Sequence, residues 1–485
     1  MATLVEPRKA CTVNPLKMSQ PLGACFAFMG MDNCMPMMHG SQGCTSFGLV
    51  LLVRHFKEAI PLQTTAMNEV STILGGLENI EQAVLNIKKR ANPSFIAIAS
   101  TGLTETKGDD VDGYLKLIHR KHGETLEGTK IVYVSTPDYV GAFEDGWGKA
   151  VMAVIDAFAE PVEEKDRKQI NLLPGCHLTA ADIDELREII ASFGLRAVVL
   201  PDISGSLDGH IPENFTPTTL GGTTLAEMQR MGASIATIAI GSQMRGAATA
   251  LEDRTGVPFR LFERITGLGA VDEFMQCLSE LSGQPVAMKY RRQRGQLQDV
   301  MLDAHFWIGG RRFAIGAEPD LLATLVHVAH DMGAEVKAAV TTTQSTVIAG
   351  LPVDEVLLGD LEDLELRAKA ERCEILLTHS HGRQAAERLG IPLLRTGLPM
   401  FDRLGASHVL MAGYRGTREL ITLWANTLLE SEHQAKPGDW PLSPESLAAA
   451  QGSAPAGGCG SGGCGCSGST ETDVSVIQLP KELQP

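Results

Sequence analysis

Short apolar runs alternate with longer segments whose apolar positions recur at helical spacing along most of the chain. The apolar runs are bounded by turn-forming residues and predict buried strands, at residues 95–99, 131–134, 196–200, 336–340 and 374–379. Helical patterns lie between or after them, as at residues 180–193, where Thr179 is the predicted cap, and at residues 321–332 and 416–430. This alternation is typical of parallel sheets covered by helices. The predicted fold class is therefore α/β, with Rossmann-like domains. Residues 1–17 predict an extended arm, and residues 19–24 and 396–403 predict turns.

The length of 485 residues exceeds what one hydrophobic core organises, and breaks in the pattern predict three such domains and a tail. We expect the first domain at residues 1–165, the second at 166–290 and the third at 291–432, with its closing helices returning toward the first. Residues 433–485 contain a Gly/Ser-rich segment that cannot bury a core, which predicts a flexible tail.

The tail contains three cysteines whose role the sequence leaves open. Cys459, Cys464 and Cys466 are closely spaced, a pattern also found where metals or clusters are bound transiently. The alternative is a linker with incidental thiols, because a segment without a fold does not fix ligand geometry.

Charge and composition limit the partners and the cellular location that can be expected. A formal net charge of −16 argues against a nucleic-acid or anionic-membrane surface, so neither partner is expected. Residues 1–19 lack the apolar core of a signal peptide, and no apolar run reaches the roughly 20 residues that span a bilayer. Ten cysteines without a secretory signal predict a reducing compartment, with free thiols or metal ligands rather than disulfides. The expected location is the cytoplasm.

The stretch at residues 33–56 carries the strongest candidate for chemistry, Cys44. A glycine-containing turn at residues 39–43 precedes this cysteine, and an apolar run at residues 47–53 predicts a buried helix after it. Unpaired amides and the helix dipole at such a junction favour a thiolate. Glycines there let the backbone approach a bulky group, as an iron–sulfur cluster requires. A buried cysteine that only packs is the alternative.

Signatures of common catalytic sites are missing. The sequence has no G-x-x-x-x-G-K-[ST] phosphate loop, no G-x-S-x-G elbow and no H-E-x-x-H pair, and Gly267-Leu268-Gly269 lacks the third glycine of a dinucleotide site. His379 and His381 flank a turn, as a metal pair or, more commonly, as two exposed histidines. The basic run at residues 289–294 predicts a solvated helix face. No catalytic residue is predicted.

Several motifs resemble the nitrogenase component 1 family. They are SQPLGA at residues 19–24, HGSQGC ending at Cys44, STG at residues 100–102 with GDD at 108–110, and GLPMFDR at residues 397–403. Further matches extend the similarity over about residues 10–430. The resemblance implies three α/β domains, in agreement with the count made from length and pattern.

The resemblance also indicates which cluster ligands this chain retains. Catalytic molybdenum–iron β subunits of the family hold their share of the P-cluster with three cysteines. The first of these positions is Ser19 here and the third is Gly102, so only Cys44 remains. One ligand implies a smaller 4Fe–4S cluster whose other three ligands come from a partner subunit. Ser19, His39 and Gln42 are left open as hydrogen-bond donors near the cluster or as residues that hold turns.

A single ligand is the pattern of the family's cofactor-assembly scaffolds, and it implies a set of partners. The expected complex is a heterotetramer with a NifE-like subunit, which holds the iron–molybdenum cofactor precursor until transfer to the apo molybdenum–iron protein. An Fe protein similar to NifH is implied as the partner that binds ATP and supplies molybdenum, homocitrate and electrons. A NifB-like protein is implied as the precursor donor.

Two alternatives to the scaffold remain. One is an enzyme, as the β-type subunit of a nitrogenase or of a protochlorophyllide reductase-like oxidoreductase, although Ser19 and Gly102 argue against the nitrogenase form. The other is a structural partner that holds no metal. The remaining cysteines before the tail match no ligand position and are predicted to be packing thiols, namely Cys25, Cys34, Cys176, Cys277 and Cys373.

Overall fold

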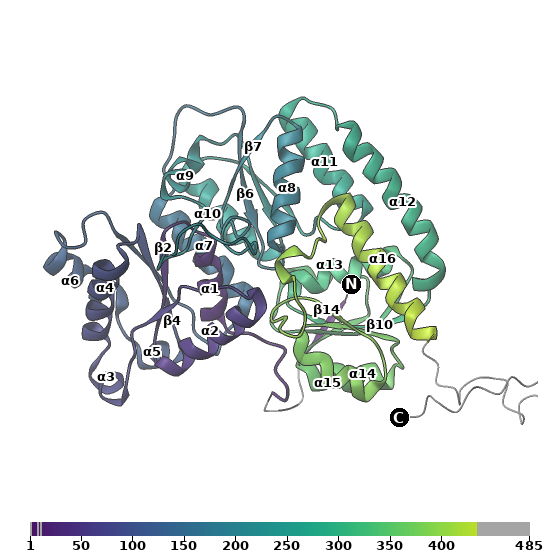
Figure 1. Cartoon of the computed structure of the whole chain (residues 1–485), viewed down its shortest axis with the longest axis horizontal. Coiled ribbons are helices and arrows are strands. Elements are labelled where there is room, and N and C mark those ends of the chain that lie inside the picture. Colours follow the sequence, from purple (N-terminus) through teal and green to yellow (C-terminus); the bar gives the residue numbers. More distant parts are fainter. Residues whose placement is uncertain (1, 7–8, 10–11, 434–485) are drawn as a thin grey trace, which may run out of the picture. The chain divides into compact units, whose positions relative to one another are not determined.

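The computed structural model describes residues 2–6, 9 and 12–433, and this part of the chain forms three parallel β-sheets flanked by helices (Figure 1). The predicted α/β class is confirmed. The predicted tail cysteines, Cys459, Cys464 and Cys466, lie outside the described residues. None of the helices in the described part combines the length and the apolar character needed to cross a membrane.

The first sheet has the strand order β3-β2-β4-β5. Its strands are β2 Cys34–His39, β3 Gln63–Thr64, β4 Phe95–Ser100 and β5 Lys130–Val134. Alternate residues of β4 point to opposite faces, so Ile96 and Ile98 pack against the helices at residues 77–91 and 111–122, while Phe95 and Ala97 join the central core. The helices of this unit are α1 Gln20–Met29, α2 Gln42–Phe56, α3 Glu69–Leu74, α4 Leu77–Ala91, α5 Gly102–Lys107, α6 Val111–His122 and α7 Phe143–Phe158.

The second sheet has the order β7-β6-β8-β9. Its strands are β6 Gln169–Pro174, β7 Arg196–Val199, β8 Thr237–Ile240 and β9 Phe259–Phe262, and its helices are α8 Ala180–Ser192, α9 Leu225–Gln229, α10 Arg245–Thr255 and α11 Leu268–Ser282. The Thr179 hydroxyl accepts a hydrogen bond from the Asp182 amide at 3.1 Å, and the Asp182 carboxylate accepts one from the Thr179 amide at 3.0 Å. The predicted cap of α8 is confirmed.

The third sheet has the order β1-β12-β11-β10-β13-β14. Its strands are β1 Thr3–Val5, β10 Arg312–Ala317, β11 Glu335–Thr341, β12 Glu355–Leu358, β13 Ile375–Thr378 and β14 Leu393–Arg395. Helices α13 Pro319–Asp331 and α16 Gly413–His433 lie on one side of it, and α14 Leu361–Ala370 and α15 Arg383–Leu389 on the other (Figure 1).

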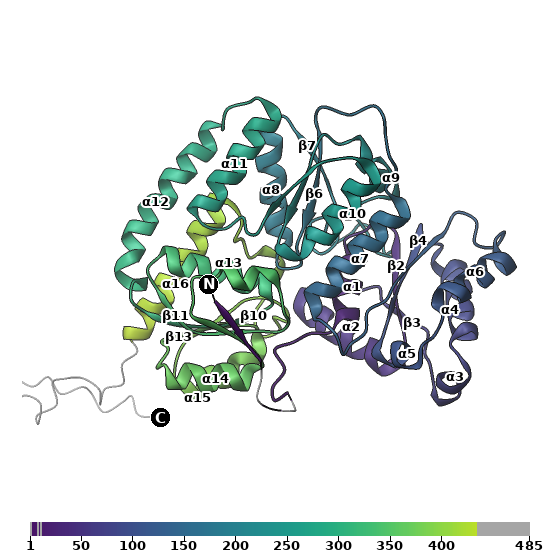
Figure 2. The same cartoon turned by 180° about the vertical axis from the view of Figure 1, so that it is seen from behind.

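The N-terminal segment was expected to be an extended arm of the first domain. Instead, β1 pairs in parallel with β12, so the start of the chain is an edge strand of the third sheet (Figure 2). The domain boundaries at residues 165 and 290 stay predictions, and helix α12, Met288–Ile308, runs across the second of them. The basic run lies on this helix, where Lys289 and Arg294 pair with Glu188 and Asp272 at 2.9 and 2.7 Å. Its prediction as a solvated helix face is confirmed.

Helix α1 corrects the prediction that residues 19–24 form a turn. The helix begins at Gln20, directly after Ser19, and Pro21 lies in its first turn. Proline is compatible with that position because the first amides of a helix have no intrahelical acceptor. All ten residues of α1 are buried, which makes it a central helix of the structure.

Helices α1 and α7 approach so closely that their backbones touch. A Cβ atom on Gly146 would overlap the carbonyl oxygen of Gln20, and one on Gly23 would overlap the carbonyl oxygen of Phe143. Any side chain at either glycine would therefore push the two helices apart. Because Ser19 directly precedes α1, this contact also fixes where Ser19 lies.

We predict that Gly146→Ala destabilises the protein by about 1–3 kcal/mol, the range for overpacking a tight contact. The matched control is Gly295→Ala on α12, where an added Cβ meets no other atom within 4 Å. That change should stabilise its helix by about 0.5–1 kcal/mol because alanine has the higher helix propensity. Thermal unfolding of both variants checks the prediction, and equal melting temperatures would contradict it.

Three carboxyl groups gather where α7 meets the third sheet. The Glu144 carboxylate accepts a hydrogen bond from the Asp320 amide at 3.2 Å, and Asp320 accepts one from the Ser242 amide at 2.9 Å. Neither side-chain oxygen of Glu318 has a hydrogen-bond partner within the described residues. Burial raises the pKa of Glu144 well above its ordinary value, and the charges of Asp320 and Glu318 raise it further.

The raised carboxyl pKa values predict a pH dependence of stability. The folded chain holds protons on these groups that the unfolded chain releases above about pH 4.5, so the free energy of unfolding falls as pH rises. Glu144→Gln should make the melting temperature less dependent on pH above about pH 4.5, and raise it at the alkaline end. Glu273→Gln, an exposed position on α11, is the control. A pH dependence equal in all three proteins would contradict this account.

Candidate functional site

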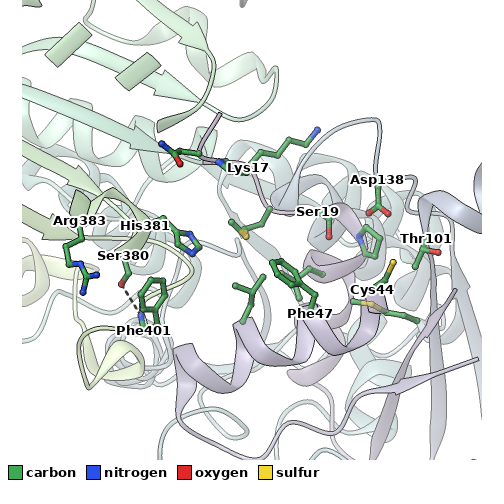
Figure 3. Close-up of a pocket in the computed structure, with 18 of the residues that line it drawn as sticks. Lys17, Ser19, Cys44, Phe47, Thr101, Asp138, Ser380, His381, Arg383 and Phe401 are labelled. Atoms are coloured by element: carbon green, nitrogen blue, oxygen red, sulfur yellow. Dashed lines mark hydrogen bonds between the residues drawn. The ribbon is translucent and has the colours of Figure 1, made fainter. Parts of the chain in front are cut away.

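A cavity of about 560 Å³ opens beside the first turn of α2 (Figure 3). Cys44, Thr101 and Asp138 lie at one side of it, and His381 and Phe401 at the other. Its walls therefore come from the segment before α1, from α2, from the ends of two strands of the first sheet and from the third sheet's loops. Loops after parallel strands are where open α/β sheets place their binding sites.

Cys44 lies where the sequence placed it, at the start of a helix. Helix α2 begins at Gln42, so Cys44 is in its first turn, and the Ser41 hydroxyl lies 3.5 Å from its sulfur. The cysteine is exposed, so the alternative of a buried packing thiol is wrong. The sulfur faces the cavity and is open to a group that lies beyond the surface of this chain.

The other described cysteines do not compete with Cys44 as ligands. Cys25, Cys34, Cys277 and Cys373 are buried, which agrees with their prediction as packing thiols, and Cys176 is half-buried. Burial raises the pKa of the Cys373 thiol to about 11 and that of Cys34 well above its ordinary value. Such thiols stay protonated and shielded.

Helix α2 was predicted to be buried, and this is wrong for one of its faces. Phe47, Val50 and Val53 are 70%, 50% and 38% exposed, while Leu51 and Leu52 are buried against the core. Apolar side chains are therefore present on both faces of the helix, but the chain itself covers only one. The exposed face begins one turn after Cys44.

Ser19 and His39, whose roles the sequence left open, lie in different environments. Ser19 lines the cavity, and its side chain makes no capping hydrogen bond to α1. His39 is fully buried at the end of β2, where its Nδ1 lies 2.9 Å from the Thr65 hydroxyl and its Nε2 lies 3.3 Å from Asp109. Burial lowers the pKa of His39. His39 thus holds the loop before α2, and Gln42 is exposed outside the cavity.

Asp138 is a site residue that the sequence did not single out. It follows β5 and accepts a hydrogen bond from the Gly102 amide at 2.9 Å, across a gap of 36 positions in the chain. Burial raises its pKa, while the Gly102 amide and the charge of Lys17 act in the opposite direction. The only signal in the sequence was its place in a loop after a predicted strand.

The wall on the third sheet is fixed by the end of α2. The Met400 amide donates to His55 Nδ1 at 2.8 Å, Lys57 donates to the Phe401 carbonyl at 3.3 Å, and Arg54 stacks on the Phe401 ring at 4.3 Å. The predicted turn at residues 397–403 is thus held against the helix that carries Cys44.

The two turn histidines differ in exposure. His379 is buried and hydrogen-bonds to the Leu16 carbonyl at 3.2 Å, so its expected exposure is wrong, whereas His381 is exposed as expected. No group of three or more His, Cys, Asp or Glu side chains converges on a metal-sized site within residues 2–6, 9 and 12–433.

Comparisons with known proteins define the class. The family model "Nitrogenase component 1 type Oxidoreductase" matches residues 19–429. A nitrogenase iron-molybdenum cofactor biosynthesis protein NifN from Bradyrhizobium diazoefficiens is 58% identical, over 92% of this chain and 96% of that protein. One from Rhodobacter capsulatus is 50% identical, over 92% and 97%. A solved structure, nitrogenase Cp1 at pH 6.5, is 32% identical with a TM-score of 0.84, over 90% of this chain and 98% of that one.

The chain therefore belongs to the nitrogenase component 1 family. Its resemblance within that family is to the cofactor biosynthesis proteins named NifN, with which it aligns over nearly the whole described length. The α/β architecture is that of nitrogenase component 1.

The exposure of Cys44 predicts its reactivity. In a brief iodoacetamide pulse on the folded protein, peptide mapping should find Cys44 alkylated well before Cys25 and Cys34, because alkylation needs an accessible sulfur. Denatured protein, in which all thiols are accessible, is the control. Equal labelling of the three cysteines in the folded protein would show that the sulfur is not open to solvent.

Proposed function

We propose that this chain is a subunit of a scaffold complex on which the precursor of the nitrogenase iron–molybdenum cofactor matures before transfer to the apo molybdenum–iron protein. In this proposal it pairs with a NifE-like subunit in a heterotetramer and lends Cys44 to a 4Fe–4S cluster shared with that partner. The observation that carries the proposal is one exposed thiol in a cavity that Ser19 also lines, while the third ligand position is Gly102, so neither of the other two positions has a sulfur.

The donor groups at the cavity are suited to bind one of the four irons of such a cluster. Cys44 offers a thiol at the start of a helix, and Ser19 and Ser41 offer hydroxyl groups on the same side of the chain. The buried thiols are not accessible to a cluster. Four thiolates complete a 4Fe–4S cluster, so the partner would supply three. When bound, the cluster supplies one-electron transfer. The exposed face of α2 next to Cys44 would then be covered by the partner.

The names of the relatives favour assembly over catalysis. NifN proteins from two species are described as cofactor biosynthesis proteins, and they align over more than nine-tenths of this chain. The oxidoreductase alternative draws on the family description, but a nitrogenase β subunit would need thiolates at positions 19 and 102. Position 19 holds a serine that lines the cavity, and position 102 holds a glycine whose amide donates to Asp138.

The partners are those that the family resemblance implies. An Fe protein similar to NifH would deliver molybdenum, homocitrate and electrons to the complex and would bind the ATP, for which this sequence has no phosphate loop. A NifB-like protein would deliver the precursor. The chain's free thiols suit the reducing compartment in which these steps would take place.

Replacing the proposed ligand tests the function. In the complex purified with its partner subunit, Cys44→Ala should remove the cluster's EPR signal and lower the iron content, because the cluster loses one of four anchors. Cys373→Ala removes a buried thiol and should change neither quantity. Unchanged iron content and EPR signal in the Cys44 variant would refute ligation by this chain.

A further inference from the structure

Asp138 is the only carboxylate among the described residues that line the cavity beside Cys44. The lining includes two strongly basic side chains, Lys17 and Arg383, and is otherwise largely apolar or neutral. Asp138 and Cys44 lie on the same side of the cavity (Figure 3). A group bound to the sulfur would therefore share this space with one fixed acidic side chain.

The Asp138 carboxyl group lies close against Gly102. A Cβ atom on Gly102 would lie 3.1 Å from the Asp138 Oδ2 and 3.2 Å from its Cβ, closer than most real contacts of a Cβ. The Gly102 amide holds the same Oδ2 at 2.9 Å. A Cβ at position 102 would therefore require Asp138 to shift by a few tenths of an ångström, whereas with glycine the backbone hydrogen bond holds the carboxylate in place.

We propose that Asp138 sets the reduction potential of the cluster bound by Cys44, as a fixed carboxylate in the space next to Gly102. This inference rests on the proposed function, because it needs the cluster to be present. A negative charge close to an iron–sulfur cluster opposes the addition of an electron, and the effect is strong where water is partly excluded. Asp138 is half-buried, so its charge is screened less than that of a surface residue.

Lys17, which lines the same cavity, tests the direction in which a nearby charge shifts the reduction potential. Its ammonium group acts electrostatically on Asp138 and lines the same cavity, so it favours the reduced cluster while Asp138 opposes it. Two side chains of opposite charge therefore predict shifts of opposite direction. Residues that only support the fold would not produce shifts of the reduction potential in opposite directions.

The experiment is an EPR-monitored redox titration of the complex purified with its partner subunit. Asp138→Asn keeps the size of the side chain and an oxygen for the Gly102 amide, and it should move the midpoint potential in the positive direction with unchanged iron content. Asp138→Glu keeps the charge and should leave the potential closer to that of the unaltered protein. Lys17→Met should move it in the negative direction.

Asp112→Asn is the matched control, because it removes an exposed carboxylate of α6 outside the cavity and should not change the potential. Asp138→Ser is a second neutral variant, in case the asparagine variant assembles poorly. If both neutral variants retain their iron content and show no shift in midpoint potential, the role of Asp138 is wrong, while the proposed function stands. An unaltered cluster in Cys44→Ala would overturn the proposed function itself.

Discussion

Helix α7 is in contact with all three α/β units, and the rest of the structure depends on that arrangement. Gly146 lets it touch the backbone of α1, the Trp147 indole donates to the Pro174 carbonyl at 2.9 Å, and Glu144 accepts from the Asp320 amide. The three contacts are with α1 of the first unit, with β6 of the second and with α13 of the third. The cavity is formed by segments of the first and third units, so its shape depends on how α7 and its neighbours hold these units together.

The α/β fold class could be predicted from the sequence because the patterns that indicate it involve residues close together in the chain. Buried strands of β-branched and apolar residues, the Thr179 cap and the helix after Cys44 all depend on residues a few positions apart. The start of α1 was missed because serine, proline and glycine there also suit a turn. Strand β1 was missed because its partner, β12, lies about 350 positions further along, and a sequence pattern carries no such pairing.

The candidate site could be predicted only in part from the sequence, for related reasons. Cys44 could be proposed from its neighbours, but the exposed face of α2 could not, because an apolar pattern does not distinguish a core from a surface that another chain covers. Phe47 and Val50 look the same in the sequence as Leu51 and Leu52. Asp138 was missed because its role depends on the Gly102 amide, which only the parallel pairing of β4 and β5 brings near.

A chain that offers one thiolate holds a shared cluster differently from a chain that offers three. With Ser19 and Gly102 at the other positions, the bonds that fix the cluster would lie mostly in the partner. In the proposed complex, this chain would act on the cluster chiefly through what surrounds it, namely hydroxyl groups, apolar walls and fixed charges. The glycine at position 102 therefore does more than remove a ligand. Its amide also holds the Asp138 carboxylate at 2.9 Å, in a position that a Cβ at residue 102 would crowd.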